Sequence, residues 1–382
     1  MLPNVKIAIA NGGLGRVTPT PDKVSGLIVT NKASSTIPLG TPFLITSSRQ
    51  VETLSEDLTP FAKRELLHFF SEAGDGSELY VMPVADTALL DDVVADSVST
   101  LHAYSQGNIR LLGISLNPAD PDFNETTELP ENFVTDVKAL QTRLNALQLA
   151  ITPSRAIVGL YGFAADKLAN LPDRASFDTP NVGVVISCAD EEEESLPTVG
   201  LALGKLAAIS VMVNIGRVKD GPVSIQDAYI GGVKAEQFEG LETLHSKGYI
   251  FLRTFPGRSG YYFNDDSSMV AANDDFSSIA RGRVIDKALT LVFDTYVEEI
   301  NDHIQVDANG MLPVSIVKSL EGAIENRINR DMASEISSVS AYIDPAQNVL
   351  STDKLEIAVR IVPLGYLKEI EISLGFENPF QG

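Results

Sequence analysis

The chain has few of the residues that cross-link proteins or bind metals. Its 382 residues include one cysteine, Cys188, so no disulfide can form within a single chain. Cys188 ends an apolar run, where the expected role is a small buried residue rather than a redox group. The four histidines, at positions 68, 102, 245 and 303, are far apart, and none lies in an HxxxH or HExxH pattern. Metal catalysis is therefore not indicated, and we expect neither a metal nor an organic cofactor.

Basic residues and long apolar runs are also scarce. Lysine and arginine total 29 against 51 acidic residues, which gives a formal charge of −22. No segment supplies the basic footprint that nucleic acid or anionic lipid requires, so we expect no direct binding to either. No apolar run approaches the roughly 20 residues of a membrane span, and residues 1–6 do not begin a signal peptide. These absences predict a protein that is made and assembled in the cytoplasm.

The composition is that of a folded protein with more than one module. Hydrophobic residues make up 44% of the chain and charged residues 21%, and the length exceeds that of one ordinary core. The first half alternates apolar strand patterns with helical ones, which predicts an open α/β sheet. The predicted strands are 24–30, 42–46, 79–84, 109–114, 156–161 and 182–187, and the predicted helices are 54–71, 133–147 and 197–209.

The pattern changes after Tyr249. Strands at 249–253 and 261–263 precede two amphipathic helices, whose apolar residues recur at the 3.6-residue spacing of one helix face. The stripes are Ile285, Leu289, Val292, Tyr296 and Ile300 in the first helix, and Val317, Leu320, Ile324 and Ile328 in the second, from Pro313 to Glu335. Strands at 339–343, 355–362 and 370–376 then close the sequence.

A strand pattern stands at each end of the chain. In the last one, Ile370, Ile372, Leu374 and Phe376 alternate with Glu369, Glu371 and Ser373, the period of a half-buried strand. In the first one, Val5, Ile7 and Ile9 precede a flexible hinge that is formed by Gly12, Gly13 and Gly15. Such terminal strands either complete the protein's own sheet or are donated to neighbouring copies.

Short motifs typical of enzymes are weak here. Gly200-Leu-Ala-Leu-Gly204-Lys205 has its glycines too close together for a phosphate loop, and we expect it inside a helix. The acidic pair Asp265-Asp266 could hold a cation, as could Asp274-Asp275. We prefer a structural role, in which Asp274 and Asp275 cap a helix that starts near Phe276.

Taken in order, several segments resemble the contractile phage tail sheath family over most of the chain, except about residues 117–132. The segments are Gly40-Thr-Pro-Phe-Leu-Ile-Thr-Ser-Ser, His68-Phe-Phe-Ser-Glu-Ala-Gly, the glycine-turned hairpin 248–263, Ile279-Ala-Arg-Gly-Arg and Val359-Arg-Ile-Val-Pro-Leu-Gly-Tyr. Their order and spacing carry the match rather than any one motif. The family's Trp-Gly-Ala-Arg-Thr after the hairpin is missing, and the chain has no tryptophan. The sequence therefore resembles a divergent, compact member, from a phage or from a phage-derived contractile injection system.

The resemblance implies a structural subunit and not an enzyme. Such subunits stack as hexameric rings around an inner tail tube, donate terminal strands to neighbouring copies, and contract to drive the tube through a cell envelope. The implied partners are other copies of the chain, the tube protein, and the baseplate and tail terminator proteins. The implied location is a virion tail or an injection particle.

The implied fold is α/β (mixed α+β) and multi-domain, with open mixed sheets and extended terminal strand arms. The expected organisation is an N-terminal arm (1–21), an outer α/β body (22–245) with an inserted subdomain around 85–150, an inner tube-facing domain (246–363) and a C-terminal arm (364–382).

Two arginines are candidates for the tube contact. Arg327 and Arg330 lie one turn apart on the helix from Pro313, and Lys318 is a weaker candidate on another face. In an acidic chain they form a local basic spot that could hold carboxylates of a partner. The alternative is an internal ion pair with Asp331 or another nearby acid.

Two other functions stay open at this stage. One is a hydrolase-like or ligand-binding enzyme with its site at the carboxyl ends of the strands, for which the chain offers no coherent catalytic set. The other is a different self-assembling shell or tube protein.

Overall fold

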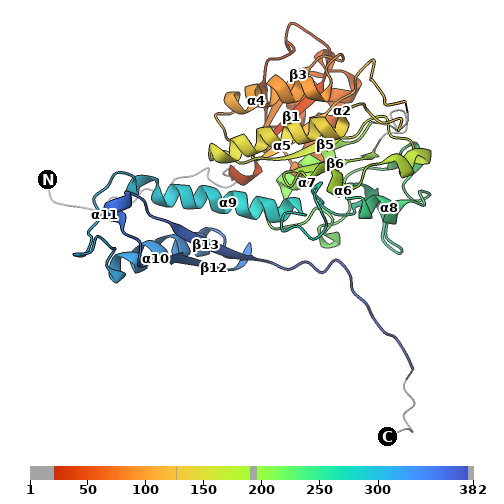
Figure 1. Ribbon diagram of the computed structural model, residues 1–382. Coiled ribbons are helices and arrows are strands. Elements are labelled where there is room, and N and C mark those ends of the chain that lie inside the picture. The colour runs from red at the N-terminus through yellow and green to blue at the C-terminus, as the bar shows by residue number, and fades with distance from the viewer. Residues whose placement is uncertain (1–20, 126, 190–195, 377–382) are drawn as a thin grey trace, which may run out of the picture. The chain divides into compact units, whose positions relative to one another are not determined.

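The computed structural model describes residues 21–125, 127–189 and 196–376, and it divides into two compact units between Val297 and Glu298. The first unit contains a six-stranded sheet of order β2-β3-β1-β4-β5-β6 (Figure 1). All neighbouring strands are parallel except β2, which runs antiparallel to β3. The strands are β1 Ser25–Thr30, β2 Phe43–Ile45, β3 Leu79–Val84, β4 Leu111–Ser115, β5 Arg155–Gly159 and β6 Val182–Val185. The predicted open α/β sheet is confirmed.

Helices cover both faces of this sheet. A Cβ at Gly26 of β1 would meet Leu101 of α4 (Val98–Tyr104). A Cβ at Gly113 of β4 would meet both Leu27, the next residue of β1, and Leu203 of α7 (Val199–Ala208), so Leu27 faces α7. Because successive strand residues point to opposite faces, α4 and α7 lie on opposite sides. All six residues of β1 are buried for this reason. The longer helices of the unit are α2 Pro60–Ala73, α4 Val98–Tyr104, α5 Phe133–Leu149, α7 Val199–Ala208 and α9 Ile279–Tyr296.

Shorter elements complete the first unit. The helices are α1 Ser48–Thr53, α3 Leu90–Asp92, α6 Arg174–Phe177 and α8 Leu241–Ser246. The strands are β7 Ser187–Cys188, β8 Tyr229–Ile230 and β9 Val233–Lys234, which form a small sheet, and β10 Leu252–Arg253 with β11 Tyr262–Phe263, which form the hairpin. Cys188 is buried, as expected.

Helix α7 packs directly on the backbone of α2. A Cβ at Gly200 would overlap the carbonyl of Glu65, and one at Gly204 would overlap the carbonyl of Phe69. Glycine at these two positions therefore lets the helices approach until their backbones touch. The helix-interior interpretation of this glycine motif is confirmed.

The amino end of α7 receives a buried carboxylate. Glu65 of α2 is fully buried, and its Oε2 accepts hydrogen bonds from the Gly200 amide at 2.7 Å and from the Ser115 hydroxyl at 3.1 Å. Burial raises the pKa of Glu65 above its ordinary value. The contact supplies an acceptor to amide groups that have no partner inside the helix.

The carboxyl end of α7 is contacted by two cations. Lys23 donates to the carbonyl of Ala208 at 2.9 Å, and Arg283 of α9 donates to the carbonyl of Leu206 at 3.0 Å. Positive groups at this end complement the helix dipole. Since α7 is apolar and buried nearly all around, these contacts satisfy carbonyls that water does not reach.

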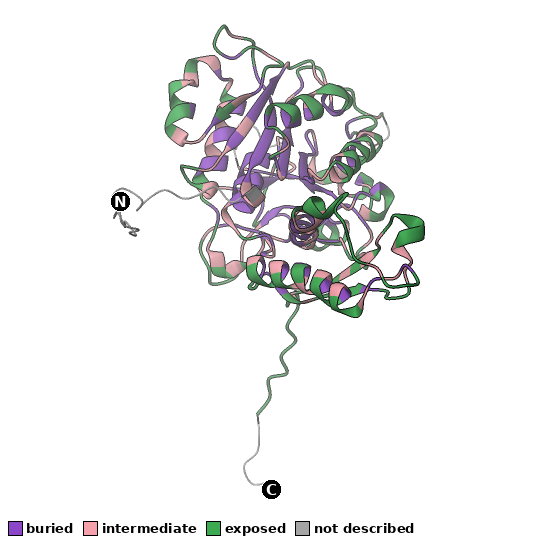
Figure 2. Cartoon of the chain, turned by 90° about the vertical axis from the view of Figure 1, so that its left-hand side faces the viewer, coloured by how far each residue is buried: buried purple, intermediate pink, exposed green. Residues whose placement is uncertain are grey.

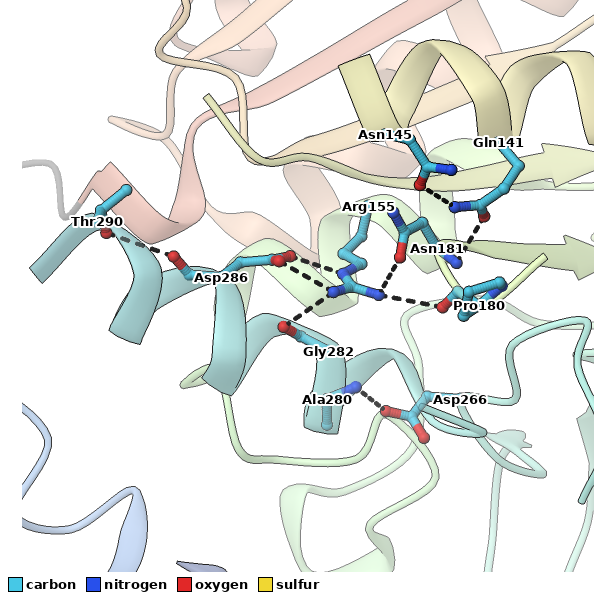
Figure 3. Close-up of polar contacts among 10 residues, drawn as sticks. All are labelled: Gln141, Asn145, Arg155, Pro180, Asn181, Asp266, Ala280, Gly282, Asp286 and Thr290. Atoms are coloured by element: carbon cyan, nitrogen blue, oxygen red, sulfur yellow. Dashed lines mark hydrogen bonds and ion pairs between the residues drawn. The ribbon is translucent and has the colours of Figure 1, made fainter. Parts of the chain in front are cut away.

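Helix α9 is joined to the sheet by the buried guanidinium of Arg155 on β5 (Figure 3). Its Nε and Nη2 donate to the two carboxylate oxygens of Asp286 at 2.6 and 2.9 Å. Nη2 also donates to the carbonyl of Gly282, and Nη1 donates to Asn181 and to the carbonyl of Pro180. A Cβ at Gly282 would overlap the guanidinium. The helix thus lies on the sheet through a charged pair with several additional hydrogen bonds.

The start of α9 corrects one prediction. The helix begins at Ile279 and not near Phe276, so Asp274 and Asp275 are not its caps. The buried carboxylate of Asp266 accepts instead, from the Ala280 amide at 2.8 Å and from the Ser278 hydroxyl at 2.7 Å. Asp274 accepts from the Phe276 amide within a turn. Asp266, which lies in the preceding loop, therefore caps α9 in place of Asp274 and Asp275, the acids that are nearest in the sequence.

The second unit is a helix packed on a hairpin. It contains α10 Val314–Asp331, β12 Ile336–Ile343, α11 Val349–Thr352 and β13 Ile357–Pro363. Strands β12 and β13 are antiparallel, with Ser340 opposite Arg360. The core of the unit contains Leu312, Val317 and Ile343, with Leu320 and Ile357 packed against it. The predicted helix and the predicted strands at 339–343 and 355–362 are confirmed, and the structure adds that these two strands pair as a hairpin. The predicted division of the assembly into modules at residue 246 stays a prediction.

We expect that breaking the Arg155 pair destabilises the first unit strongly. Arg155→Met leaves Asp286 buried without its counter-ion, which typically costs about 3–5 kcal/mol. Arg155→Met/Asp286→Leu should recover much of that loss, since the uncompensated charge is then gone. Chemical unfolding followed by circular dichroism measures both variants. Lys63→Met, which breaks the exposed pair with Glu52, is the control and should cost about 1 kcal/mol or less. If Arg155→Met alone also lowered the free energy of unfolding by only about 1 kcal/mol, the Arg155–Asp286 pair would not stabilise the first unit as we expect.

Candidate subunit-contact site

The described residues after β13 are exposed (Figure 2), and their sequence has an apolar strand pattern. Ile370 is 70% exposed, Ile372 80%, Leu374 97% and Phe376 110%. Within the described part of the chain, residues 370–376 pair with no strand. We call residues 364–376 the C-terminal segment. Exposed apolar residues at a strand period need a partner sheet to be buried.

The other predicted arm lies outside the described residues. Val5, Ile7 and Ile9, and the hinge at Gly12, Gly13 and Gly15, belong to residues 1–20. Their roles as a strand arm and hinge stay predictions.

The hairpin of the second unit has one covered face and one open face. Along β13, Ile357, Val359 and Ile361 are half-buried, while Ala358 and Arg360 between them are exposed. On β12, Ser340 and Tyr342 lie opposite Arg360 and Ala358 and are also exposed, as is Ser338. The apolar side belongs to the core with α10, and the polar side faces solvent.

Two glutamates of α10 bind the backbone of β12. Glu325 accepts from the Ala341 amide at 2.7 Å, and Glu321 accepts from the Ile343 amide at 2.8 Å. Lys318 donates to the second oxygen of Glu321 at 2.6 Å, and this hydrogen bond and the one from Ile343 lower the pKa of Glu321. The sequence analysis missed both glutamates. Their spacing of four residues beside the inward stripe of the helix was the available signal.

The three tube-contact candidates all make internal ion pairs. Arg327 and Arg330 share one acid, Asp331, at 2.8 and 2.7 Å, and Lys318 pairs with Glu321. Two guanidinium groups on a single carboxylate leave one net positive charge at this end of α10. The side chains of Arg327 and Arg330 remain 39% and 66% exposed, so a partner carboxylate can still reach them.

The first unit contains a small acidic pocket, which is a candidate site for the alternative function as an enzyme. This cavity of about 70 Å³ follows the carboxyl ends of β3 and β5 and is lined in part by Asp91, Asp122, Glu131, Asp136 and Tyr161. Burial, with the neighbouring Asp91 charge, raises the pKa of Asp136 to about 6. Burial also raises the pKa of Tyr161 to about 12. The lining contains no nucleophile with an adjacent base, so it does not form a catalytic set.

The described residues offer neither a metal site nor a membrane span. Among residues 21–125, 127–189 and 196–376, no three His, Cys, Asp or Glu side chains are grouped so that they could hold a metal ion. In the same residues, every helix is too short or too polar to cross a membrane.

Two family models match the chain. DUF2586, N-terminal domain, matches residues 2–267, and DUF2586, C-terminal domain, matches residues 275–381. No curated protein matches.

Several solved structures share this fold. The anti-feeding prophage helical sheath in its contracted state is 16% identical with a TM-score of 0.63, and the alignment covers 99% of each chain. The contracted sheath complex of an extracellular contractile injection system, PVC, is 11% identical with a TM-score of 0.59, covering 99% of this chain and 98% of that one. A sheath tail protein from Desulfitobacterium hafniense is 9% identical with a TM-score of 0.53, covering 94% and 100%. At these identities the likeness shows a common fold.

The raised pKa of Asp136 predicts a pH-dependent gain from Asp136→Asn. A carboxyl group whose pKa is raised by folding stabilises the fold while it is protonated, and that stability is lost as the pH rises toward about 6. The melting temperature of Asp136→Asn should therefore exceed that of wild type by a margin that grows between pH 4 and pH 6 and is constant above. In a protein that already carries Asp91→Asn, which removes the neighbouring charge, adding Asp136→Asn should raise the melting temperature by less than it does in wild type. A margin that does not change with pH would contradict the ionisation account.

Proposed function

The chain belongs to the DUF2586 family, whose two models together match most of it, and from its sheath fold we propose that it is a structural subunit of a contractile tail sheath. The observation that carries the proposal is the fold shared with two contracted sheath proteins. The alignment covers 99% of both chains in one case, and 99% of this chain and 98% of the other chain in the second. The exposed C-terminal segment supports it, because a subunit that donates a strand must present one before assembly.

In this proposal, copies of the chain stack as hexameric rings around an inner tube, and contraction drives that tube through a cell envelope. The energy is stored in a bistable lattice and not in a bound nucleotide. The partners are other copies, the tube protein, and the baseplate and terminator proteins, in a phage tail or an injection particle. The subunit is not an enzyme.

Terminal strands connect the subunits in the proposed lattice. Residues 370–376 add to a sheet of a neighbouring copy, and the arm of Val5, Ile7 and Ile9 does the same behind its glycine hinge. The inner module of residues 246–363 faces the tube. An acidic surface suits such a protein, because like charges keep subunits apart until assembly starts.

An enzyme is the weaker alternative for a specific reason. The pocket beside Asp136 and Tyr161 is small and offers carboxylates without a nucleophile. Another kind of self-assembling shell would share the exposed C-terminal segment, but the sheath fold favours a contractile tube.

Deletion of residues 370–382 should abolish polymerisation and leave a folded protein. Burying each of the four exposed apolar side chains stabilises the contact by about 1.5–3 kcal/mol, so most of the strand contact is lost with them. Electron microscopy scores tubes or rings, and circular dichroism scores folding. A full-length control with Ser at positions 370, 372, 374 and 376 should behave like the deletion. Long tubes formed by the truncated protein would remove the strand-donation claim.

Charge reversal tests the tube contact. Arg327→Glu/Arg330→Glu should reduce tube-templated assembly several-fold in low salt and leave assembly without tube unchanged, because the net positive charge near Asp331 is gone. Cosedimentation with assembled tubes measures this. Asp331→Asn is the matched control: it breaks the same internal pairs but keeps the positive charge, so tube binding should persist. If both variants lose binding equally, the arginines act only within the subunit.

A further inference from the structure

The small pocket of the first unit has charged side chains of one sign only. They are Asp91 of α3, Asp122 and Glu131 of the loop before α5, and Asp136 in the first turn of α5. Among the described residues, no lysine, arginine or histidine lines the pocket. Carboxylates that share a small space repel one another, and the effect is visible at Asp136, whose pKa rises to about 6 through burial and the Asp91 charge.

A buried phenol shares the pocket and has no hydrogen-bond partner. Tyr161 follows β5, is only 6% exposed and lines the cavity. Its hydroxyl makes no hydrogen bond within the described chain, whereas the equally buried Tyr249 and Tyr261 each donate to an oxygen of the fold. Burial, followed by the charges of Asp136 and Asp91, raises the pKa of Tyr161 to about 12, so the hydroxyl lies near both carboxylates and keeps its proton. A buried polar group without a partner is costly, and a ligand in the pocket would supply one.

The shape of the pocket favours an organic cation over a metal ion. The part of the chain that the structure describes contains no group of three His, Cys, Asp or Glu side chains that could hold a metal, so the carboxylates do not converge on one point. The cavity of about 70 Å³ holds more than one water, which needs roughly 10–15 Å³. Apolar side chains line it as well, namely Leu89, Leu90, Pro130 and Phe133. A molecule with an alkyl stem and a cationic end matches both kinds of lining.

The loop that forms one wall is held from outside the pocket. Glu128 accepts from Lys167 at 2.8 Å, and the ring of Phe123 packs edge-on against the ring of Tyr161, with 6.3 Å between the ring centroids. These contacts use neither the pocket carboxylates nor the phenol hydroxyl. The loop lies within residues 117–132, which the sequence resemblance to sheath proteins does not cover. The pocket is therefore built in part from residues that the resemblance leaves unexplained.

We propose that this pocket binds a primary alkylammonium group, whose N–H groups donate to Asp91, Asp136 and the phenol oxygen of Tyr161. The alkyl stem packs against Leu89 and Pro130. An ammonium group has three donors and no acceptor, so it suits a lining of acceptors, and its charge replaces repulsion between the carboxylates by attraction. Two sources carry this group: a free diamine or polyamine, and a lysine side chain of a second copy.

The helix dipole of α5 offers a purely structural explanation for part of this cluster. Asp136 and Glu131 lie at the amino end of the helix, where carboxylates complement the dipole. That role does not account for the phenol of Tyr161, which comes from the end of β5 and is neutral. The two explanations also differ in what they predict for ligand binding, because a dipole contact needs no cation in the pocket.

Isothermal titration calorimetry of the full chain with 1,4-diaminobutane tests the site at pH 7, below the concentration at which the protein polymerises. Wild type should show one saturable site per chain. The diol 1,4-butanediol, which has the same length and no charge, should not bind. Calcium chloride at matched ionic strength should not reproduce the signal. Absence of saturable binding of the diamine, or equal binding of calcium, would overturn the proposal.

Two variants separate the pocket from the general negative charge of the chain. Asp136→Asn and Tyr161→Phe should each weaken diamine binding about tenfold, since each removes one hydrogen bond to a charged group. Tyr161→Phe keeps the ring and removes only the oxygen. Glu242→Gln changes an exposed acid of α8 outside the pocket and should bind like wild type. If Glu242→Gln weakens binding as much as Asp136→Asn, or if Tyr161→Phe binds like wild type, the site assignment is wrong.

The affinity should also depend on pH. An alkylamine, with a pKa of about 10.4, stays charged between pH 5 and pH 7, whereas Asp136 becomes protonated as the pH falls through about 6. The groups that line the pocket with it are Asp91, Asp122, Glu131 and Tyr161, and none of them is a cation. Binding should therefore weaken below about pH 6, and Asp136→Asn should reduce this dependence. A wild-type affinity that does not change with pH would contradict the role of Asp136.

Assembly experiments distinguish the two sources of the ammonium group. If a lysine of a second copy fills the pocket, Asp136→Asn and Tyr161→Phe raise the concentration needed for polymerisation, and 1,4-diaminobutane inhibits wild type. If a free amine is the ligand, the variants polymerise like wild type. Both results support the ammonium site and identify its source. The inference does not depend on the sheath function, because calorimetry uses single chains: a wild type that forms no rings or tubes but binds the diamine refutes the function and keeps the site.

Discussion

The first unit depends on one buried cation. The guanidinium of Arg155 contacts Asp286 and Gly282 of α9 and the Pro180-Asn181 loop, and the amide of Asn181 in turn donates to Gln141 of α5 (Figure 3). A buried charge is tolerated only when its hydrogen bonds are complete, so the elements that carry these groups must be placed together. This coupling joins the sheet, α5 and α9 through one set of polar contacts.

Apolar periodicity in the sequence was sufficient to predict the strands of the sheet, both long helices of the second half and the two strands β12 and β13, because burial on one or two faces leaves a local pattern. Polar contacts across the fold left none. Asp266 caps α9 from 14 residues away, and Glu321 reaches Ile343 across 22 residues. Sequence reasoning chose the nearest acids, Asp274 and Asp275, because it can weigh distance along the chain and not distance in space.

In the candidate subunit-contact site too, the local apolar pattern could be predicted from the sequence and the polar contacts between elements could not. The C-terminal pattern of Ile370 to Phe376 was visible because its alternation is local, and the structure finds those side chains exposed. The contacts of the hairpin backbone were not predicted. They depend on which element lies beside each strand, and at β12 two carboxylates of α10 accept from the strand amides. The same helix also holds Arg327 and Arg330, whose shared partner Asp331 was foreseen as an alternative.

The two glutamates of α10 also determine how the helix lies along the hairpin. Glu325 accepts from the Ala341 amide and Glu321 from the Ile343 amide, so the helix runs antiparallel to β12 and contacts it at two points. Four residues of a helix rise about 6 Å and two residues of a strand about 7 Å, so the two spacings match. A shift of α10 along the strand would break both hydrogen bonds together. Apolar packing alone would tolerate such a shift, and the position of the helix along the strand is therefore determined by polar contacts.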